Sequence, residues 1–199
     1  MQQKNIPVLT SGLDGHLVIL EAKMNIILKN KINEMQINEI RALLKFCDNE
    51  FIPSLSSRSS THQTSFTQEN KQNCIDTYVN ELISQIVLLV YEDSKFAGFL
   101  SFINGFSYEE IPDIASSNYI TTICISHEHR NQRILNALYE FLIHKLPQKL
   151  VCPYISTRTW STNIFHIRVL KKLDFGEVFR LSNHRGIGID TVYYAKKMS

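Results

Sequence analysis

The chain has 199 residues, of which 44% are hydrophobic, so it can bury a substantial core and one domain is the expected organisation. Its 21 basic and 19 acidic residues give a formal net charge of +2, which argues against a nucleic-acid footprint or an acidic tail. No apolar run approaches the roughly 20 residues that span a bilayer. We therefore expect neither nucleic acid nor membrane as a partner.

The cysteines and the N-terminus indicate the compartment. Cys47, Cys74, Cys124 and Cys152 form neither a CxxC pair nor a dense disulfide ladder, which is typical of reduced thiols in the cytosol. The first residues, MQQKNIPVLTSG, lack the basic-then-apolar pattern of a signal peptide. These features predict a cytoplasmic protein.

The first part of the chain predicts an appendage followed by a strand and two helices. Residues 1–23 are expected to be an extension or extra strand, with strand character in 16–23, outside a main domain of residues 24–199. Residues 25–32 predict a strand. Residues 37–46 carry apolar side chains at helical spacing.

Two segments of different character follow. The Ser/Thr-rich segment 53–66 has the composition of a mobile surface loop. Residues 68–83 place apolar side chains on one side and predict an amphipathic packing helix.

The pattern is clearer from residue 86 onward. Residues 86–93 and 96–105 predict a β-hairpin, because two apolar runs flank the short turn DSK. A third strand is predicted at 119–126. It leads into a helix that starts near Asn131 and stops before Pro147.

The last part of the chain alternates strands with a helix. Residues 151–160 predict a strand, and 161–175 a helix capped by Ser161, Thr162 or Asn163. A short strand and a turn precede the last strand, TVYYAKKM. The order predicts an α/β (α+β) domain with a mixed, mostly antiparallel central sheet flanked by helices.

The junction between the third strand and its helix has the character of an anion site. The unpaired N–H groups and the dipole of a helix start add to the charges of Arg130 and Arg133, which suits a pyrophosphate. The alternative is a solvated basic helix start.

Three motifs in order resemble the GCN5-related N-acetyltransferase (GNAT) superfamily. ICISHEHRNQRILNAL resembles its motif A, and STRTWSTNIFHIRVLKKLDF resembles its motif B, with Asn163 in the asparagine slot. The hairpin IVLLVYEDSKFAGFLSF has the family's strand, turn and x-x-G pattern.

The resemblance implies a GNAT-like fold with acetyl-coenzyme A as co-substrate. No metal is expected, because the seven histidines are scattered and His127 and His129 lack cysteine or carboxylate companions at site spacing beyond Glu128. The strand before the loop would polarise the thioester carbonyl, and the loop would hold the pyrophosphate. The implied cofactor-binding residues are Ile123, Cys124, Ile125, Arg130, Asn131, Gln132, Arg133, Ile134, Leu135, Asn136 and Asn163.

The chain departs from the family pattern at several slots. The three loop glycines fall on Asn131, Arg133 and Leu135, and the late helix glycine falls on Asp174. Backbone N–H groups do the binding, so side chains that point away are tolerable, although Leu135 would crowd a pyrophosphate unless it faces the core. The frequent tyrosine of motif B falls on Leu170, which cannot donate a proton.

The implied chemistry is direct attack of a primary amine on the acetyl thioester, with a base for the amine and an acid for the thiolate. The predicted catalytic residues are Asp190, Glu109 and Tyr194, and the predicted acceptor-binding residues are Trp160, Arg185 and Asp190. Glu110, His127 and His129 are further base candidates, and Tyr139 and Tyr193 are further acid candidates. The candidates for contact with the coenzyme's 3′-phosphate are Arg158, Arg168, Lys171 and Lys172.

Two functions stay open on these residues. The first is an N-acetyltransferase acting on a small-molecule or peptide amine that the sequence does not identify. The rival is a non-catalytic acyl-coenzyme A sensor or protein-interaction module, which the missing glycines and tyrosine favour. An exposed last strand would be compatible with a homodimer.

Overall fold

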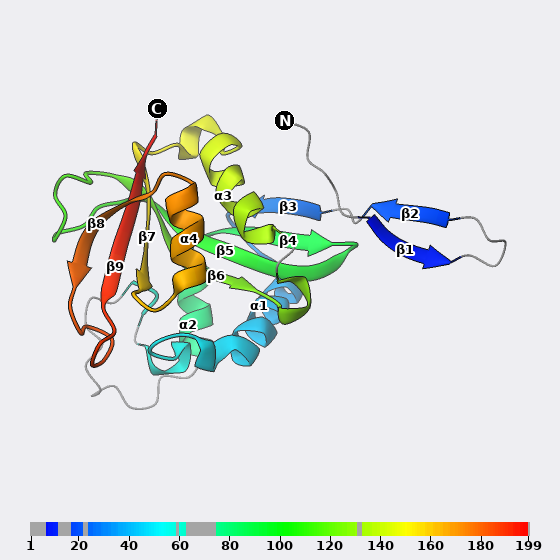
Figure 1. Cartoon of the computed structure of the whole chain (residues 1–199), viewed down its shortest axis with the longest axis horizontal. Coiled ribbons are helices and arrows are strands. Elements are labelled where there is room, and N and C mark those ends of the chain that lie inside the picture. Colours follow the sequence, from blue (N-terminus) through cyan, green and yellow to red (C-terminus); the bar gives the residue numbers. More distant parts are fainter. Residues whose placement is uncertain are drawn as a thin grey trace.

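The structure, a computed structural model, describes residues 7–11, 17–21, 24–58, 60–62, 75–130 and 133–198 (Figure 1). Seven strands form the main sheet in the order β3-β4-β5-β6-β7-β9-β8. Their bounds are β3 Met24–Lys29, β4 Ile86–Glu92, β5 Lys95–Phe106, β6 Ser117–Ile125, β7 Tyr154–Trp160, β8 Gly176–Leu181 and β9 Thr191–Lys197. Among the strands that the structure describes, only β6 and β7 pair in parallel, which confirms the mixed, mostly antiparallel sheet.

Helices cover both faces of this sheet (Figure 1). α1 (Glu34–Cys47) and α2 (Ile75–Leu82) pack on one face, and α3 (Ile134–His144) and α4 (Ile164–Lys172) pack on the other. The described residues also form the short 3-10 helices η1 (Asp48–Glu50), η2 (Leu55–Ser57), η3 (His127–His129) and η4 (Gln148–Leu150). None of the helices in the described part of the chain combines the length and the hydropathy that a membrane span needs.

The apolar run of β4 explains why the sheet is covered on both sides. Leu88 and Val90 are completely buried in the core beneath α3 and α4. Val87 and Leu89 are completely buried against α1 and α2. A strand without polar alternation is stable only between two layers, so this strand fixes a three-layer arrangement.

The N-terminal strands form a separate two-stranded sheet. β1 (Pro7–Ser11) pairs antiparallel with β2 (Leu17–Glu21), and Figure 1 shows this hairpin extending away from the main sheet. The sequence predicted the second of these strands and not the first.

Two predictions about the chain's periphery are wrong. The segment after Pro53 is not simply a surface loop, because Leu55 and Thr61 are buried, and Thr61 donates its backbone N–H and its hydroxyl to the Glu81 carboxylate at 2.8 and 2.7 Å. The last strand is not an exposed edge, since β9 lies between β7 and β8. Within the predicted helix 68–83, residues 75–82 are helical as α2, while residues 68–74 lie outside the described residues.

Candidate active site

A wedge opens between the two parallel strands at the centre of the sheet. β6 and β7 are paired from Ser117 and Tyr154 up to Ile120 and Thr157. Beyond this point β6 continues to Ile125 and β7 to Trp160, without any further pairing between them. The backbone of β6 after Ile120 therefore presents polar groups that β7 does not satisfy.

A β-bulge explains why the strands part at this point. Ser101 of β5 lies opposite Thr122, and Phe102 lies opposite Ile120, so Thr121 is an extra residue in β6. A bulge bends its strand and increases the local twist. The last residue paired with β7, Ile120, immediately precedes this bulge, so the bend turns the rest of β6 away from β7.

The glycine of the hairpin motif permits the close packing of β5 against this part of β6. Gly98 lies opposite Ile125, and a Cβ atom on Gly98 would come within 2.5 Å of the Cys124 carbonyl oxygen. Real Cβ atoms do not approach a carbonyl oxygen so closely, so any other residue would force the strands apart. Gly98 is therefore required for the geometry of the wedge.

The wedge has a different lining on each face of the sheet. Ile123 and Ile125 pack toward the core beneath α3 and α4, whereas Cys124 packs toward α1 and α2. On the latter side, the hydroxyl groups of Tyr78 and Thr122 lie 2.7 Å apart. Burial raises the pKa of Tyr78, so its hydroxyl is protonated at neutral pH.

The loop after β6 leads into the start of α3 through a left-handed residue. Arg133 has φ = 63° and occupies the N-cap position without a side-chain cap hydrogen bond. It stands at one of the family's glycine slots, and a left-handed residue is the conformation for which glycine is preferred. Asn131 and Gln132 lie outside the described residues.

The first turn of α3 keeps its large side chains on the core side. Ile134 is 1% exposed, and Leu135 is half-buried and packs against the same core. Leu135 thus packs against the core of the domain and does not project into the solvent in front of the helix. The Oδ1 atom of Asn136 is buried and has no hydrogen-bond partner in the described part of the chain.

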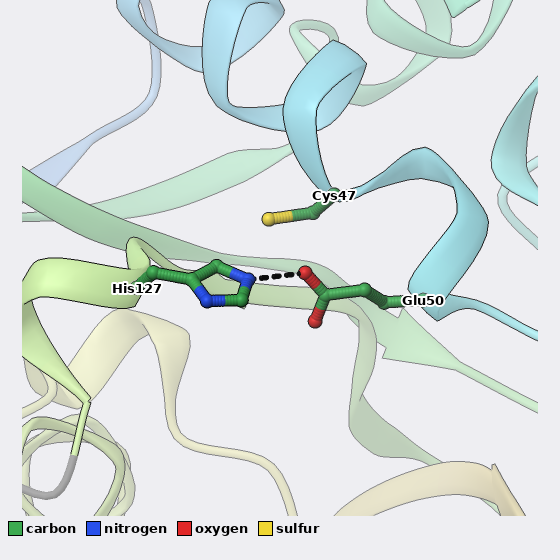
Figure 2. A group of neighbouring side chains, drawn as sticks. All are labelled: Cys47, Glu50 and His127. Carbon is green, nitrogen blue, oxygen red and sulfur yellow. Dashed lines mark hydrogen bonds and ion pairs between the residues drawn. The ribbon is translucent and has the colours of Figure 1, made fainter.

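Contacts with Glu50 fasten the loop to η1, directly after α1, and Figure 2 shows the contact between His127 and Glu50. His127 Nε2 lies 2.6 Å from Glu50 Oε1, and Arg130 Nη2 lies 2.8 Å from Glu50 Oε2. The Nε group of Arg130 also donates to the Ile125 carbonyl oxygen at 3.2 Å. The side chain of Arg130 therefore braces the loop from the α1 side.

The same cluster is the one group of possible metal ligands found among the described residues. The ligand atoms of Cys47, Glu50 and His127 lie within 4.8 Å of one another, and these residue types bind zinc. However, the guanidinium group of Arg130 contacts Glu50 at 2.8 Å and lies 3.7 Å from Cys47 Sγ. A metal cation would have to displace this positive charge, so the geometry favours the ion pair.

Motif B forms α4 and both of its ends. The Asn163 side chain caps the helix by accepting from the His166 N–H at 3.4 Å. At the other end, Asp174 has φ = 62°, and Phe175 N–H donates to the Leu170 carbonyl oxygen at 3.0 Å. These features form a Schellman motif, in which the left-handed residue is usually glycine.

The predicted catalytic residues lie in three different environments. Asp190 accepts from Arg180 at 2.7 Å and from the backbone N–H of Asn183 at 2.9 Å. Glu109 is exposed between β5 and β6, and Tyr194 is buried in the core beneath α4. No hydrogen bond or ion pair in the described ranges joins these three side chains, and their roles stay predictions.

The predicted acceptor-binding residues Trp160 and Arg185 do lie together. The Arg185 guanidinium carbon lies 5.8 Å from the centre of the Trp160 ring, on the α1 and α2 side. Sequence reasoning missed Arg58 and Tyr78 on this side. A usable signal was Arg58 itself, since it is a long charged side chain within a run of small polar residues.

Comparison with known proteins identifies the fold. No protein-family model matches the chain, and no curated protein matches it. Solved structures do. An N-acetyltransferase from Staphylococcus aureus Mu50 is 15% identical, with 88% of this chain and 99% of that chain covered and a TM-score of 0.59.

Two similar structures were solved with ligands. Arabidopsis thaliana NAA60 in complex with a bisubstrate analogue is 14% identical, with 88% of this chain and 99% of that chain covered and a TM-score of 0.59. Salmonella typhimurium yncA with acetyl-CoA is 13% identical, with 88% and 95% covered and a TM-score of 0.57. Together with the diverging strands, these similarities show that the chain has the fold of the GNAT superfamily of acetyltransferases.

Proposed function

We propose that the chain is an N-acetyltransferase that transfers the acetyl group of acetyl-coenzyme A to a primary amine. The observation that carries this proposal is the wedge, in which the pairing of β6 and β7 stops at Ile120 and Thr157 while both strands continue. A thioester placed there would meet polar backbone groups that have no partner in β7. These groups are held by a rigid sheet, as electrostatic catalysis requires.

The coenzyme would lie with its pyrophosphate at the start of α3. The first backbone N–H groups of a helix lack intrahelical acceptors, and the helix dipole adds positive potential at this end. Arg133 is exposed at this end and adds a full charge. The segment from Asn131 to Asn136 would therefore replace a glycine-rich loop in function.

The reaction would be a direct transfer. The amine nitrogen attacks the carbonyl carbon, the C–S bond breaks, and the amine loses a proton as the thiolate leaves or is protonated. Backbone N–H groups of residues 123–125 would stabilise the oxyanion. Tyr78 is a candidate acid, because its protonated hydroxyl lies beside Thr122 on the diverging part of β6.

A second candidate function is an acyl-coenzyme A sensor without catalysis. The observation that favours it is Leu170, which stands in the tyrosine slot of motif B and is completely buried in the core. This side chain cannot donate a proton to the leaving thiolate. The sensor would bind acetyl-coenzyme A but would not consume it.

The cysteines support the cytoplasmic location expected from the sequence. Cys47, Cys124 and Cys152 are free thiols and are buried.

A small-molecule or peptide amine is the proposed second substrate.

Binding and turnover are tested separately. Isothermal titration with acetyl-coenzyme A should show binding that Arg133→Glu weakens by about 10- to 100-fold, the equivalent of one charge-assisted hydrogen bond. The matched control is Lys149→Glu. Lys149 lies in η4, before the start of β7 and therefore at the end of the parallel pair opposite the wedge, so this variant should bind acetyl-coenzyme A normally. Equal affinity of both variants would remove the α3 start from the site.

Release of the coenzyme thiol during incubation with a mixture of primary amines then distinguishes the two candidates. An enzyme releases the thiol only when amine is present, and Tyr78→Phe should slow the release if Tyr78 is the acid. Tight binding without amine-dependent release would favour the sensor.

A further inference from the structure

Three arginines from separate parts of the chain converge on the α1 and α2 side of the wedge. Arg58 follows η2, Arg158 lies in β7 just beyond its last residue paired with β6, and Arg185 lies between β8 and β9. Arg58 is 6% exposed and Arg185 is 9% exposed. Arginine is almost never buried to this extent unless its charged group is paired.

The two most buried guanidinium groups are held by one short segment. Arg58 donates to the Pro53 carbonyl oxygen at 2.8 Å, and Arg185 donates to the carbonyl oxygen of the preceding residue, Ile52. The Arg58 guanidinium carbon lies 5.6 Å from the centre of the Phe51 ring, and the Arg185 guanidinium carbon lies 5.8 Å from the centre of the Trp160 ring. The two aromatic rings are themselves 6.0 Å apart, so the two charges share one aromatic platform.

The third charge lies on the same face of β7 as this platform. Arg158 and Trp160 are two residues apart in a strand, so their side chains point to the same side of the sheet. Arg158 lies opposite Tyr193 of β9. Its position places a positive charge at the narrow end of the wedge, next to the last paired residue of β7.

The three charges act on one another in a poorly solvated space. Burial, followed by the positive charges of Arg58 and Arg158, lowers the pKa of Arg185 to about 9. Arg185 still carries its charge at neutral pH. An anion placed beside these three side chains would be attracted by all three charges.

We propose that the acyl acceptor is a small amine that also carries an anionic group, and that Arg58, Arg158 and Arg185 bind this group beside the wedge. The inference rests on the proposed acetyltransferase function and narrows its substrate class. Guanidinium groups match the planar, two-oxygen face of a carboxylate and also bind phosphate. The acceptor must be small or extended, because a folded surface does not reach residues as buried as Arg58 and Arg185.

The single tryptophan offers a probe that does not depend on catalysis. Trp160 is the only tryptophan in the chain and stacks under Arg185, so an anion bound by these arginines should change its fluorescence. We would titrate the full chain with propionate and with inorganic phosphate at constant ionic strength. Chloride serves as the control for non-specific charge screening.

Variants assign the binding to the cluster. Arg158→Gln should weaken anion binding by about 10- to 100-fold, since it removes charge-assisted hydrogen bonds. Arg168→Gln is the matched control on α4, on the opposite face of the sheet, and should bind as the unchanged chain does. Arg158→Lys keeps the charge at the same site and should give an intermediate affinity, which keeps the test valid if the Gln variant unfolds.

The outcomes separate this inference from the proposed function. Saturable binding of either anion that depends on Arg158 supports the site, and preference for one anion tells carboxylate from phosphate. Absence of a fluorescence response, or a response that Arg158→Gln leaves unchanged, overturns it. Both results hold whether or not acetyl-coenzyme A binds.

Turnover with matched amines completes the test. β-Alanine would be compared with propylamine, and phosphoethanolamine with ethanolamine, in the thiol-release assay. The anionic member of a pair should have the higher kcat/KM by about tenfold or more, and Arg158→Gln should remove this advantage. Preferential acetylation of the uncharged members would contradict the proposal.

Discussion

Arg133 is the residue at which the loop's altered sequence meets its required geometry. With φ = 63° it adopts a conformation that costs a non-glycine residue about 1–2 kcal/mol. Arg133→Gly removes this cost, but a new glycine also gives the unfolded chain more freedom, which costs about 0.4–1 kcal/mol. The difference predicts a net stabilisation of about 0.5–1 kcal/mol.

Urea denaturation followed by circular dichroism measures this change directly. In a thermal melt, a gain in stability of this size corresponds to a rise in Tm of roughly 1–4 °C for a chain of this length. The control is Arg168→Gly, an exposed position inside α4, which should lose about 1 kcal/mol because glycine is a poor helix former. Equal destabilisation by both substitutions would refute the argument that the slot of Arg133 demands a left-handed residue.

Three further predictions follow from the described contacts. Gly98→Ala should destabilise the chain by about 1–3 kcal/mol in urea denaturation, because the Cβ atom of the new alanine would clash with the Cys124 carbonyl oxygen. An unchanged free energy of unfolding would contradict the close packing of β5 and β6. Burial alone would raise the pKa of Glu50, but its bonds to His127 and Arg130 outweigh burial and lower it below the ordinary value of 4.5. The stability from this network is therefore present above pH 4.5 and is lost as the pH falls through the pKa of Glu50 in the folded protein. Glu50→Gln should thus lower the free energy of unfolding by at most about 1 kcal/mol at pH 7 and by less at pH 3. A cost that does not depend on pH would exclude the ion pair as its source. If Asp190 is the base, Asp190→Asn should reduce turnover by about a hundredfold or more while the affinity for acetyl-coenzyme A stays unchanged; full turnover would limit Asp190 to its contact with Arg180.

Local patterns in the sequence predicted most of the main sheet. The hairpin of β4 and β5 and the strand-to-helix junction at β6 and α3 follow from apolar runs, a turn and helical spacing. The resemblance to a known family also marked the glycine slots, and the structure explains two of them, since Arg133 and Asp174 are left-handed. What the sequence alone did not reveal is that these slots keep their backbone conformation after the glycine is lost.

The acceptor side could not be predicted, because it is assembled by tertiary contacts. Arg58 lies in a segment whose composition indicates solvent, yet Leu55 draws that segment into the core with α1 and α2. Tyr78 looked like an ordinary packing residue of an amphipathic helix, and only the fold brings its hydroxyl to Thr122. Local periodicity in the sequence cannot predict that two residues 44 positions apart come into contact.

Strand order was also beyond local patterns. Thr191–Lys197 is the last strand of the chain, but the connection through the loop around Arg185 places it inside the sheet, with Gly176–Leu181 at the edge. A sequence pattern specifies which residues are buried and not which neighbour buries them. This insertion is what carries Arg185 and Tyr193 next to Arg158.

The central claim is that the wedge between β6 and β7 receives an acyl thioester. The most direct test is the carbon-13 resonance of the thioester carbonyl in acetyl-coenzyme A labelled at that carbon, measured free and bound to the protein. We expect the bound resonance to move downfield, because hydrogen bonds from β6 withdraw electron density from the carbonyl. A resonance that stays at its free position when titration shows the site to be saturated would place the thioester outside the wedge and contradict the account.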